Sequence, residues 1–311
     1  MVKIERLTDS VKLGEAPHWD PEAQTLYYVD ILGMSIYQYE PATKKVSKAS
    51  VGLNLVSFII PVEGEKNQFI VSLGREIVRI FWNSELQDVR VIEQLAEVEQ
   101  APEFFESRFN DGKCDPLGRL WAGTFNTVSE KPLDYPPKGA LYSLNSERQI
   151  QQHLKGLRLS NGIAFNIKLK AMYFIDSGKG TIDQYDFDIK AGTISKCRAI
   201  FTLSKHQISG IADGMTIDID GNLWVAIFNG SRIIKIDPRK PETLLDSIQM
   251  PVKQITSLTF GGPNLDELYV TTGAYKLENE DLPPPENGAL YRITGVGTRG
   301  LPATNFRFIN I

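Results

Sequence analysis

Short apolar runs recur along the whole chain at a nearly constant interval. Six of them have the alternating or aromatic and aliphatic character of β-strands, and turn residues such as Asp20 and Pro21 precede them. They are LYYVD at 26–30, FIVSL at 69–73, LWAGT at 120–124, MYFID at 172–176, LWVAI at 223–227 and LYVTT at 268–272. Successive starts are 43 to 52 residues apart, and a second strand-like run follows most of them, as at 35–41 and 181–188. This pattern is typical of an antiparallel sheet.

A sixfold repeat of this length is typical of β-propeller blades. Dividing 311 residues by six gives about 52 per unit, close to the length of a four-stranded propeller repeat. We therefore predict an all-β fold, a six-bladed β-propeller with four-stranded antiparallel blades that forms one domain over residues 1–311. A two-sheet sandwich and two successive small β domains are the alternatives, but no Ser-, Gly- or Pro-rich linker divides the chain.

Two segments carry separate expectations. Residues 83–107 have apolar residues three or four apart, as in a helix, although Val89 and Val91 also suit an outer strand. The C-terminal run 304–311 alternates like a strand. We expect it to pair with residues 2–7, which would close the ring and remove two free edges.

Equivalent polar residues precede the six apolar runs. Counting back 10 to 12 residues from each start gives Glu15, Ser57, Asn110, Asn161, Asp213 and Ser257. The innermost strand of each blade lines the central channel, so these positions would form a ring at one mouth of that channel. Asn and Asp are also common turn formers at strand starts, which is the simpler reading of any one of them alone.

The carboxylates in this ring point to a cation. Glu15 and Asp213 would repel each other unless a cation or a proton lies between them. Oxygen ligands without His or Cys favour a hard divalent cation. We predict one bound Ca²⁺, with Mg²⁺, Mn²⁺ and Zn²⁺ as alternatives.

Composition and charge narrow the choice of partner. Lys and Arg total 34 against 38 Asp and Glu, giving a net charge of −4, and no dense basic run suggests nucleic acid or a membrane surface. No segment has the roughly 20 apolar residues of a spanning helix. Cys114 and Cys197 are too few for a disulfide framework. We expect a cytoplasmic monomer or weak dimer whose partner is a small molecule.

The chain carries five motifs in order. They are GEAPHWD at 14–20, RFNDGKCDPLGRLWAGT at 108–124, SNGIAF at 160–165, ADGMTIDIDGNLWVA at 212–226 and SLTFGGPNLDELYVTT at 257–272. Together they resemble the senescence-marker, regucalcin and gluconolactonase family. The phrases at 55–62 and 260–271 look most like its insect branch, which includes anterior fat body proteins and firefly luciferin-regenerating enzyme.

This resemblance implies both a metal site and a substrate site. One divalent cation at the channel mouth would be bound by Glu15, Asn161 and Asp213. Arg108 and Asn110 would contact substrate. In the same motif, the resemblance gives Asp111 the role of supporting the metal's water shell or the local turn.

The chain departs from the family at one place. Vertebrate sugar lactonases carry acidic residues shortly after the Gly-Thr that ends the motif at 108–124, whereas residues 125–128 here read FNTV. We expect a contact to a substrate hydroxyl to be missing. The Pro-rich stretches 129–138 and 277–287 would emerge on the same face and form a rim or lid over the metal.

The implied chemistry is hydrolysis of a lactone or a related small molecule. A hard cation polarises a carbonyl or activates water, Asp213 would act as general base, and Arg108 with Asn110 would orient the ring. The insect branch implies an alternative, luciferin regeneration by cleavage of oxyluciferin. A third reading is a non-enzymatic calcium-binding propeller, against which Arg108 and Asn110 weigh.

Other reactive residues are assigned structural roles. The three histidines have no triad or metal-ligand spacing, and His18 is expected to pack or to bond a turn. Residues 218–222 resemble the start of a calcium loop but are interpreted as a hairpin turn, because position twelve is Asn229. We expect Cys114 to be buried and Lys113 to be solvated.

Overall fold

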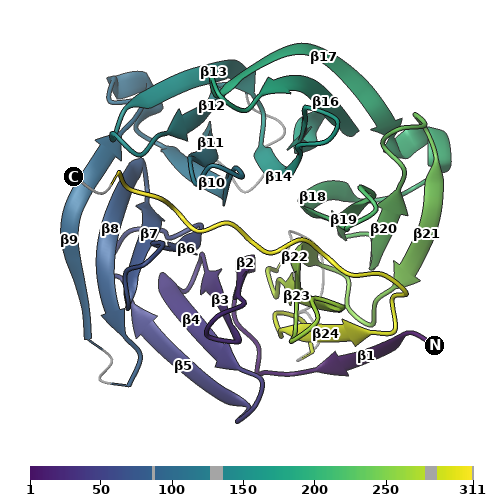
Figure 1. Cartoon of the computed structure of the whole chain (residues 1–311), viewed down its shortest axis with the longest axis horizontal. Coiled ribbons are helices and arrows are strands. Elements are labelled where there is room, and N and C mark those ends of the chain that lie inside the picture. Colours follow the sequence, from purple (N-terminus) through teal and green to yellow (C-terminus); the bar gives the residue numbers. More distant parts are fainter. Residues whose placement is uncertain (86–87, 127–135, 277–285, 310–311) are drawn as a thin grey trace.

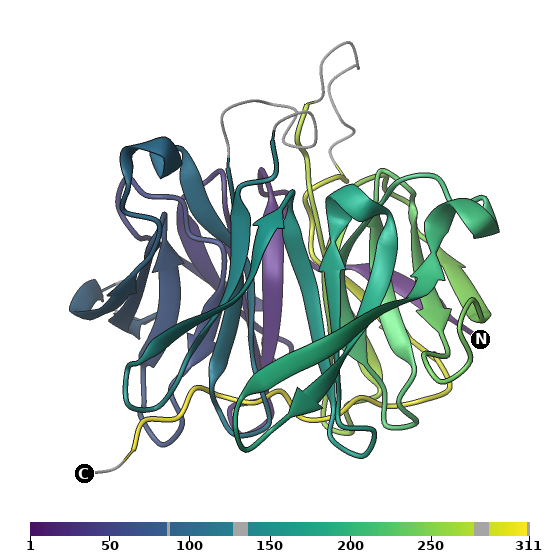
Figure 2. The same ribbon diagram turned by 90° about the horizontal axis from the view of Figure 1, so that it is seen from above.

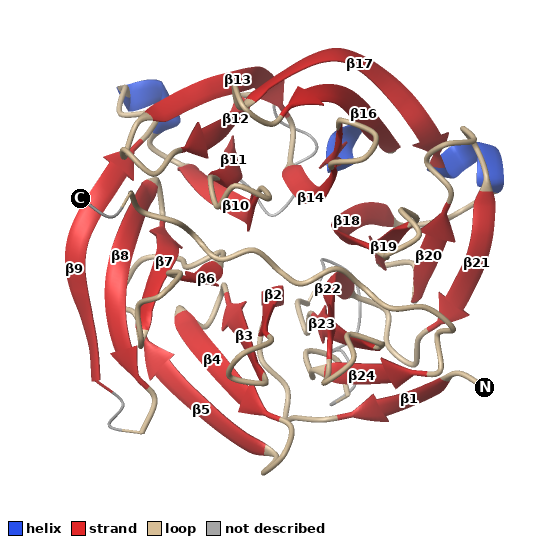
Figure 3. Cartoon of the chain, in the orientation of Figure 1, coloured by secondary structure: helices blue, strands red, loops and turns tan. Residues whose placement is uncertain are grey.

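Six antiparallel sheets of four strands each are arranged in a ring around a central axis (Figures 1 and 3). The computed structural model describes residues 1–85, 88–126, 136–276 and 286–309. Within these residues, helix is limited to three short 3₁₀ turns, η1 (Pro102–Phe104), η3 (Ser177–Lys179) and η4 (Leu203–His206). The prediction of an all-β propeller with six four-stranded blades is confirmed.

In the first three blades the strands follow one another outward from the channel. The strands of the first blade are β2 (Gly14–Asp20), β3 (Thr25–Asp30), β4 (Ser35–Glu40) and β5 (Lys45–Ser50). Those of the second are β6 (Ile59–Pro61), β7 (Gln68–Leu73), β8 (Glu76–Asn83) and β9 (Asp88–Glu97). Those of the third are β10 (Ser107–Cys114), β11 (Leu120–Asn126), β12 (Gly139–Leu144) and β13 (Ile150–Leu157). The outer-strand reading of the segment around Val89 is therefore correct.

The remaining blades follow the same order until the last. The strands of the fourth blade are β14 (Ser160–Asn166), β15 (Ala171–Asp176), β16 (Thr181–Asp188) and β17 (Thr193–Thr202). Those of the fifth are β18 (Ile211–Ile217), β19 (Leu223–Phe228), β20 (Arg232–Ile236) and β21 (Leu244–Gln249). The sixth contains β22 (Ile255–Gly261), β23 (Glu267–Thr272), β24 (Tyr291–Thr294) and β1 (Lys3–Arg6).

The N-terminal strand closes the ring. β1 pairs antiparallel with β24, from Lys3 opposite Thr294 to Arg6 opposite Tyr291, and so becomes the outermost strand of the sixth blade. The predicted pairing between residues 304–311 and the N-terminus is wrong. Because the C-terminal part of the chain supplies three strands to this blade, its open outer edge is β24, and β1 covers that edge.

The C-terminal residues 299–308, which we call the C-terminal strap, cross the ring instead (Figures 1 and 2). Backbone bonds tie the strap to the turns that follow the inner strands: Ile219 N to Arg299 O at 2.9 Å, Gly300 N to Leu265 O at 2.8 Å and Arg307 N to Gly118 O at 3.0 Å. The strap therefore lies on the face where the inner strands end. It covers the lower mouth of the channel, opposite the mouth where the inner strands begin.

Side chains fix the strap as well. Phe306 is fully buried, in a cluster that includes Phe58, Phe109 and Leu120. His18 Nε2 lies 2.9 Å from Asn305 Oδ1, and burial lowers the pKa of His18 to about 4, so the ring is neutral at pH 7. The structural role expected of His18 is confirmed.

Hydrogen bonds to buried aspartates stabilise two of the hairpin turns. Asp218 Oδ1 accepts the Asn222 amide at 2.8 Å, and its Oδ2 accepts Trp224 Nε1 at 3.1 Å. Asp115 receives Trp121 Nε1 in the same way, at 3.0 Å. Each carboxylate satisfies the turn and a buried indole together, and the hairpin interpretation of residues 218–222 is correct.

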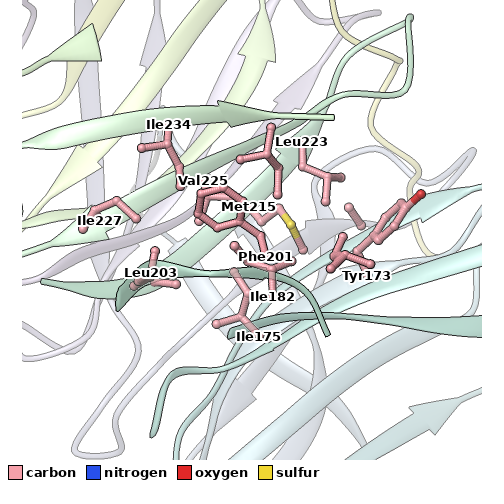
Figure 4. Close-up of a cluster of buried hydrophobic side chains, with 14 of the residues drawn as sticks. Tyr173, Ile175, Ile182, Phe201, Leu203, Met215, Leu223, Val225, Ile227 and Ile234 are labelled. Carbon is pink, nitrogen blue, oxygen red and sulfur yellow. The ribbon is translucent and has the colours of Figure 1, made fainter. Parts of the chain in front are cut away.

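Apolar clusters between neighbouring blades hold the inner strands in place. Figure 4 shows the cluster between the fourth and fifth blades, where Tyr173, Phe201, Met215 and Val225 are 0 to 1% exposed. Interiors of this density resist displacement. The inner strands therefore present their polar positions to the channel on a rigid frame.

The strap should contribute substantially to stability. Phe306→Ala removes a fully buried ring, so we expect the free energy of unfolding to fall by about 3 to 5 kcal/mol in urea denaturation. Phe105→Ala is the control, because that ring is 79% exposed and its loss should cost less than about 0.5 kcal/mol. Equal small losses in both variants would show that the strap is only loosely attached.

Candidate metal and substrate site

The predicted polar residues occupy β-bulges at the beginning of the inner strands. Strand pairing shifts register between Glu15 and His18 in β2, and between Phe109 and Gly112 in β10. The same occurs between Ser160 and Ile163 in β14, between Ala212 and Met215 in β18, and between Ile255 and Ser257 in β22. A bulge inserts an extra residue and turns its side chain out of the normal alternation. In this way Glu15, Asn110, Asn161 and Asp213 are presented at one mouth of the channel.

Two glycines allow neighbouring inner strands to approach at this level. A Cβ added to Gly162 would lie 2.7 Å from Asp213 O and 2.7 Å from Met215 Cβ. A Cβ on Gly214 would lie 2.1 Å from Ser257 Oγ. The glycine after the polar residue in S-N-G and A-D-G is therefore required for the close packing of β14 on β18 and of β18 on β22.

Ser177 fixes the orientation of the Asn161 amide. The Ser177 hydroxyl donates to Ala212 O at 2.6 Å, so it has no second proton to give. It accepts Asn161 Nδ2 at 2.8 Å. The opposite atom, Asn161 Oδ1, accepts Asn110 Nδ2 at 2.9 Å and is left as an oxygen donor for a ligand.

Arg108 lies in a buried network beside this amide. Its Nη1 lies 2.8 Å from Ser57 Oγ and 3.0 Å from Asn110 Oδ1. The guanidinium carbon sits 4.4 Å from the centre of the Phe125 ring, which is a cation–π contact. Arg108 is 8% exposed, and its Nε has no partner among the described residues. Burial lowers the pKa of this guanidinium to about 10, so it is charged at neutral pH.

Three buried carboxyl groups, those of Glu15, Asp111 and Asp213, interact electrostatically with one another. Burial first, and then the charge of Asp111, raise the pKa of Glu15 to about 8. Burial, with the charges of Glu15 and Asp111, raises the pKa of Asp213 well above its usual range. Burial also raises the pKa of Asp111. In the absence of a cation, Glu15 therefore holds a proton at neutral pH, and the pKa values of Asp111 and Asp213 are shifted in the same direction.

This donor set fits a hard cation. Two buried carboxyl groups, Glu15 and Asp213, and the oriented oxygen of Asn161 supply oxygen ligands, as Ca²⁺ and related ions prefer. Within the described residues, this site included, no three or more His, Cys, Asp or Glu side chains form a group that could hold a metal by themselves. A cation here would depend on the neutral amide of Asn161 together with the two acids.

Sequence reasoning placed most of these residues near one another, and their roles as ligands and substrate contacts stay predictions. Glu15, Asn110, Asn161, Asp213 and Arg108 are brought together as predicted, and Asp111 faces the same acidic group. It did not identify Ser177. This residue follows the fourth apolar run, and nothing in the sequence around Ser177 indicates that its hydroxyl bonds Asn161.

Lys113, which we expected to be solvated, is partly buried. Its ammonium donates to Met215 O at 2.6 Å. Cys114 is buried, as expected. The proposed lid segments 129–138 and 277–287 lie largely outside the described residues. No helix in the described ranges is long and apolar enough to cross a membrane.

Comparison with known proteins agrees with the propeller fold and shows the family. A family model described as the SMP-30/gluconolactonase/LRE-like region matches residues 13–274. Regucalcin from Xenopus laevis is 33% identical over 307 residues, which cover 98% of each chain. Human regucalcin is 33% identical over 302 residues, covering 96% of this chain and 97% of the relative. The chain belongs to the SMP-30/gluconolactonase family.

Comparison with solved structures indicates which branch of the family the chain resembles. A luciferin-regenerating enzyme superimposes with a TM-score of 0.94 at 42% identity, covering 99% of this chain and 100% of that one. This supports the insect-type branch. A calcium-binding regucalcin from Agrobacterium tumefaciens has a TM-score of 0.84 at 20% identity over 97% of each chain, which is a likeness of fold. Together these relatives support a lactonase-type or related function.

The raised pKa of Glu15 predicts how the metal-free protein responds to pH. Between the ordinary value of 4.5 and the raised value of about 8, Glu15 binds more protons in the folded state than in the unfolded chain. This group therefore makes the free energy of unfolding fall as pH rises through that window. We expect Glu15→Gln to gain stability relative to the wild type between pH 5 and pH 8, measured by urea denaturation in chelator.

Glu22→Gln, at an exposed turn, is the matched control and should keep a constant difference from the wild type. A constant difference for Glu15→Gln as well would mean that Glu15 is not held in a protonated form in the metal-free state.

Proposed function

We propose that the chain is a divalent-cation-dependent hydrolase that opens a lactone or a related small acyl compound at the upper channel mouth. The observation that carries this proposal is the meeting of Glu15, Asp213 and the oriented Asn161 oxygen beside the buried guanidinium of Arg108. Calcium is the preferred ion, since all the donors are oxygens. Such an ion, when bound, would polarise a carbonyl oxygen and keep the surrounding carboxyl groups ionised.

Protein groups account for the remaining steps. Asp213 accepts a proton from the attacking water as the water oxygen bonds to the carbonyl carbon. The ring carbon–oxygen bond then breaks, and the leaving oxygen takes the proton that Asp213 accepted, which gives a hydroxy acid and restores the carboxylate. The buried Nε of Arg108 has no partner among the residues that the structure describes, and in such a setting a hydrogen bond to a substrate oxygen is strong. Asn110 links the two sites, because its Oδ1 accepts Arg108 Nη1 and its Nδ2 donates to Asn161 Oδ1.

A second candidate is luciferin regeneration at the same site. The luciferin-regenerating enzyme shares 42% of its residues with this chain over 99% of the chain. Phe125, beside Arg108, stands in the region where vertebrate sugar lactonases are expected to be acidic. Because Phe125 is buried against Arg108 and brings no acid to this region, its presence favours a flat aromatic substrate over a polyhydroxylated ring.

Activity assays separate these candidates. Metal-free protein would be tested against aldonolactones and oxyluciferin in parallel, with each divalent cation added back. We expect turnover that depends on the added cation. Tight calcium binding without turnover of either substrate class would favour a non-enzymatic calcium-binding propeller.

Asp213→Asn tests the mechanism. It removes the general base and one charged ligand, so we expect kcat/KM to fall at least about 100-fold, together with weaker cation binding. Asp188→Asn, at the exposed end of β16, should behave as the wild type. Unchanged cation binding and turnover in Asp213→Asn would contradict this assignment.

A further inference from the structure

Lys113 is a charged group inside the channel to which the proposed reaction gives no role. It lies on the inner strand β10, three residues after Asn110, and its ammonium reaches Met215 O on the inner strand β18 at 2.6 Å. These strands belong to the third and fifth blades, and β14 of the fourth blade lies between them (Figure 1). The side chain therefore spans the channel.

The ammonium also interacts electrostatically with two other buried groups. These are Asp111 and His18 of β2, although burial is the main influence on the pKa of each. Burial lowers the pKa of Lys113 itself, while Asp111 raises it. A lysine on β10 that acts on β2 and bonds β18 must point toward the common axis of these inner strands.

Met215 ends the bulge that carries Asp213. The register of β18 shifts between Ala212 and Met215, so the position of Asp213 depends on how that bulge is held. Its outer side is fixed, because the Met215 side chain is 1% exposed in the apolar cluster of Figure 4. On the β14 side, the backbone packs against Gly162.

The channel side of this bulge is an edge of the sheet, where no further strand pairs with β18. Edge carbonyls need a partner when water is scarce. Lys113 supplies that partner at Met215.

We propose that Lys113 is a positioning residue that holds the β18 bulge from the channel side and so sets the place of Asp213 in the cation site. The inference rests on the proposed cation-dependent function. Lys113 touches neither the cation nor the substrate in this role. It acts through the backbone of β18.

Cation affinity distinguishes positioning from a simple effect of charge. Removing a positive charge near a cation site should by itself tighten cation binding, because a repulsion is lost. Losing a support for a ligand should weaken binding instead, typically by about 10- to 100-fold. The direction of the change in calcium affinity therefore reports which role dominates.

The experiment compares three variants by calorimetric calcium titration. We expect Lys113→Met to lower calcium affinity about 10- to 100-fold, and Lys113→Arg, which keeps a charged donor, to restore most of it. Lys155→Met, an exposed lysine of β13, is the control and should match the wild type. If Lys113→Met binds calcium as tightly as the wild type, or more tightly, the proposal is overturned. Should Lys113→Met not fold, Lys113→Gln makes the same test, because its amide is one bond too short to reach Met215 O.

Hydrogen exchange of the metal-free protein tests the tether without any cation. We expect the peptide covering 211–217 to exchange several-fold faster in Lys113→Met than in the wild type, while the peptide covering 35–40 in the first blade stays unchanged. Equal exchange at 211–217 would overturn the proposal. A wild-type protein that binds no cation would refute the proposed function, and the exchange result would still decide the role of Lys113.

Discussion

The placing of carboxyl groups together, away from water, is the constraint on which the site depends. Glu15, Asp111 and Asp213 come from three different blades, yet the pKa of each is raised. Burial is the main cause in all three, and the charge of Asp111 adds to the effect on Glu15 and Asp213. Such an arrangement is unfavourable unless protons or cations offset the charge. The fold tolerates it because packing between the blades fixes the inner strands regardless of the charge they carry.

The propeller supplies this rigidity in two ways. Apolar clusters fill the spaces between blades, as Figure 4 shows for the fourth and fifth. Both chain ends then close the structure: β1 completes the sixth blade, and the C-terminal strap covers the lower channel mouth. Ligand exchange is thereby directed to the upper mouth, where the bulges present Glu15, Asn161 and Asp213.

Much of this could be predicted from the sequence, because the fold repeats. The apolar period gave the number of blades, and residues at equivalent places in the repeat had to share one level of the channel. Features outside the repeat could not be predicted in this way. Backbone hydrogen bonds attach much of the strap, and such bonds leave no pattern in the sequence. An alternating run such as 304–311 indicates a strand but does not show which segment it contacts. Lys113 and Ser177 act on strands of other blades, so their roles depend on distances across the channel.

Calcium titration of the metal-free protein tests the central claim most directly. Because the pKa of Glu15 is raised to about 8 when no cation is present, this group holds a proton at neutral pH, and cation binding must release it. Calorimetry in two buffers of different ionisation enthalpy should show one calcium per chain, with protons released at pH 7. Absence of binding, or binding without proton release, would contradict the account.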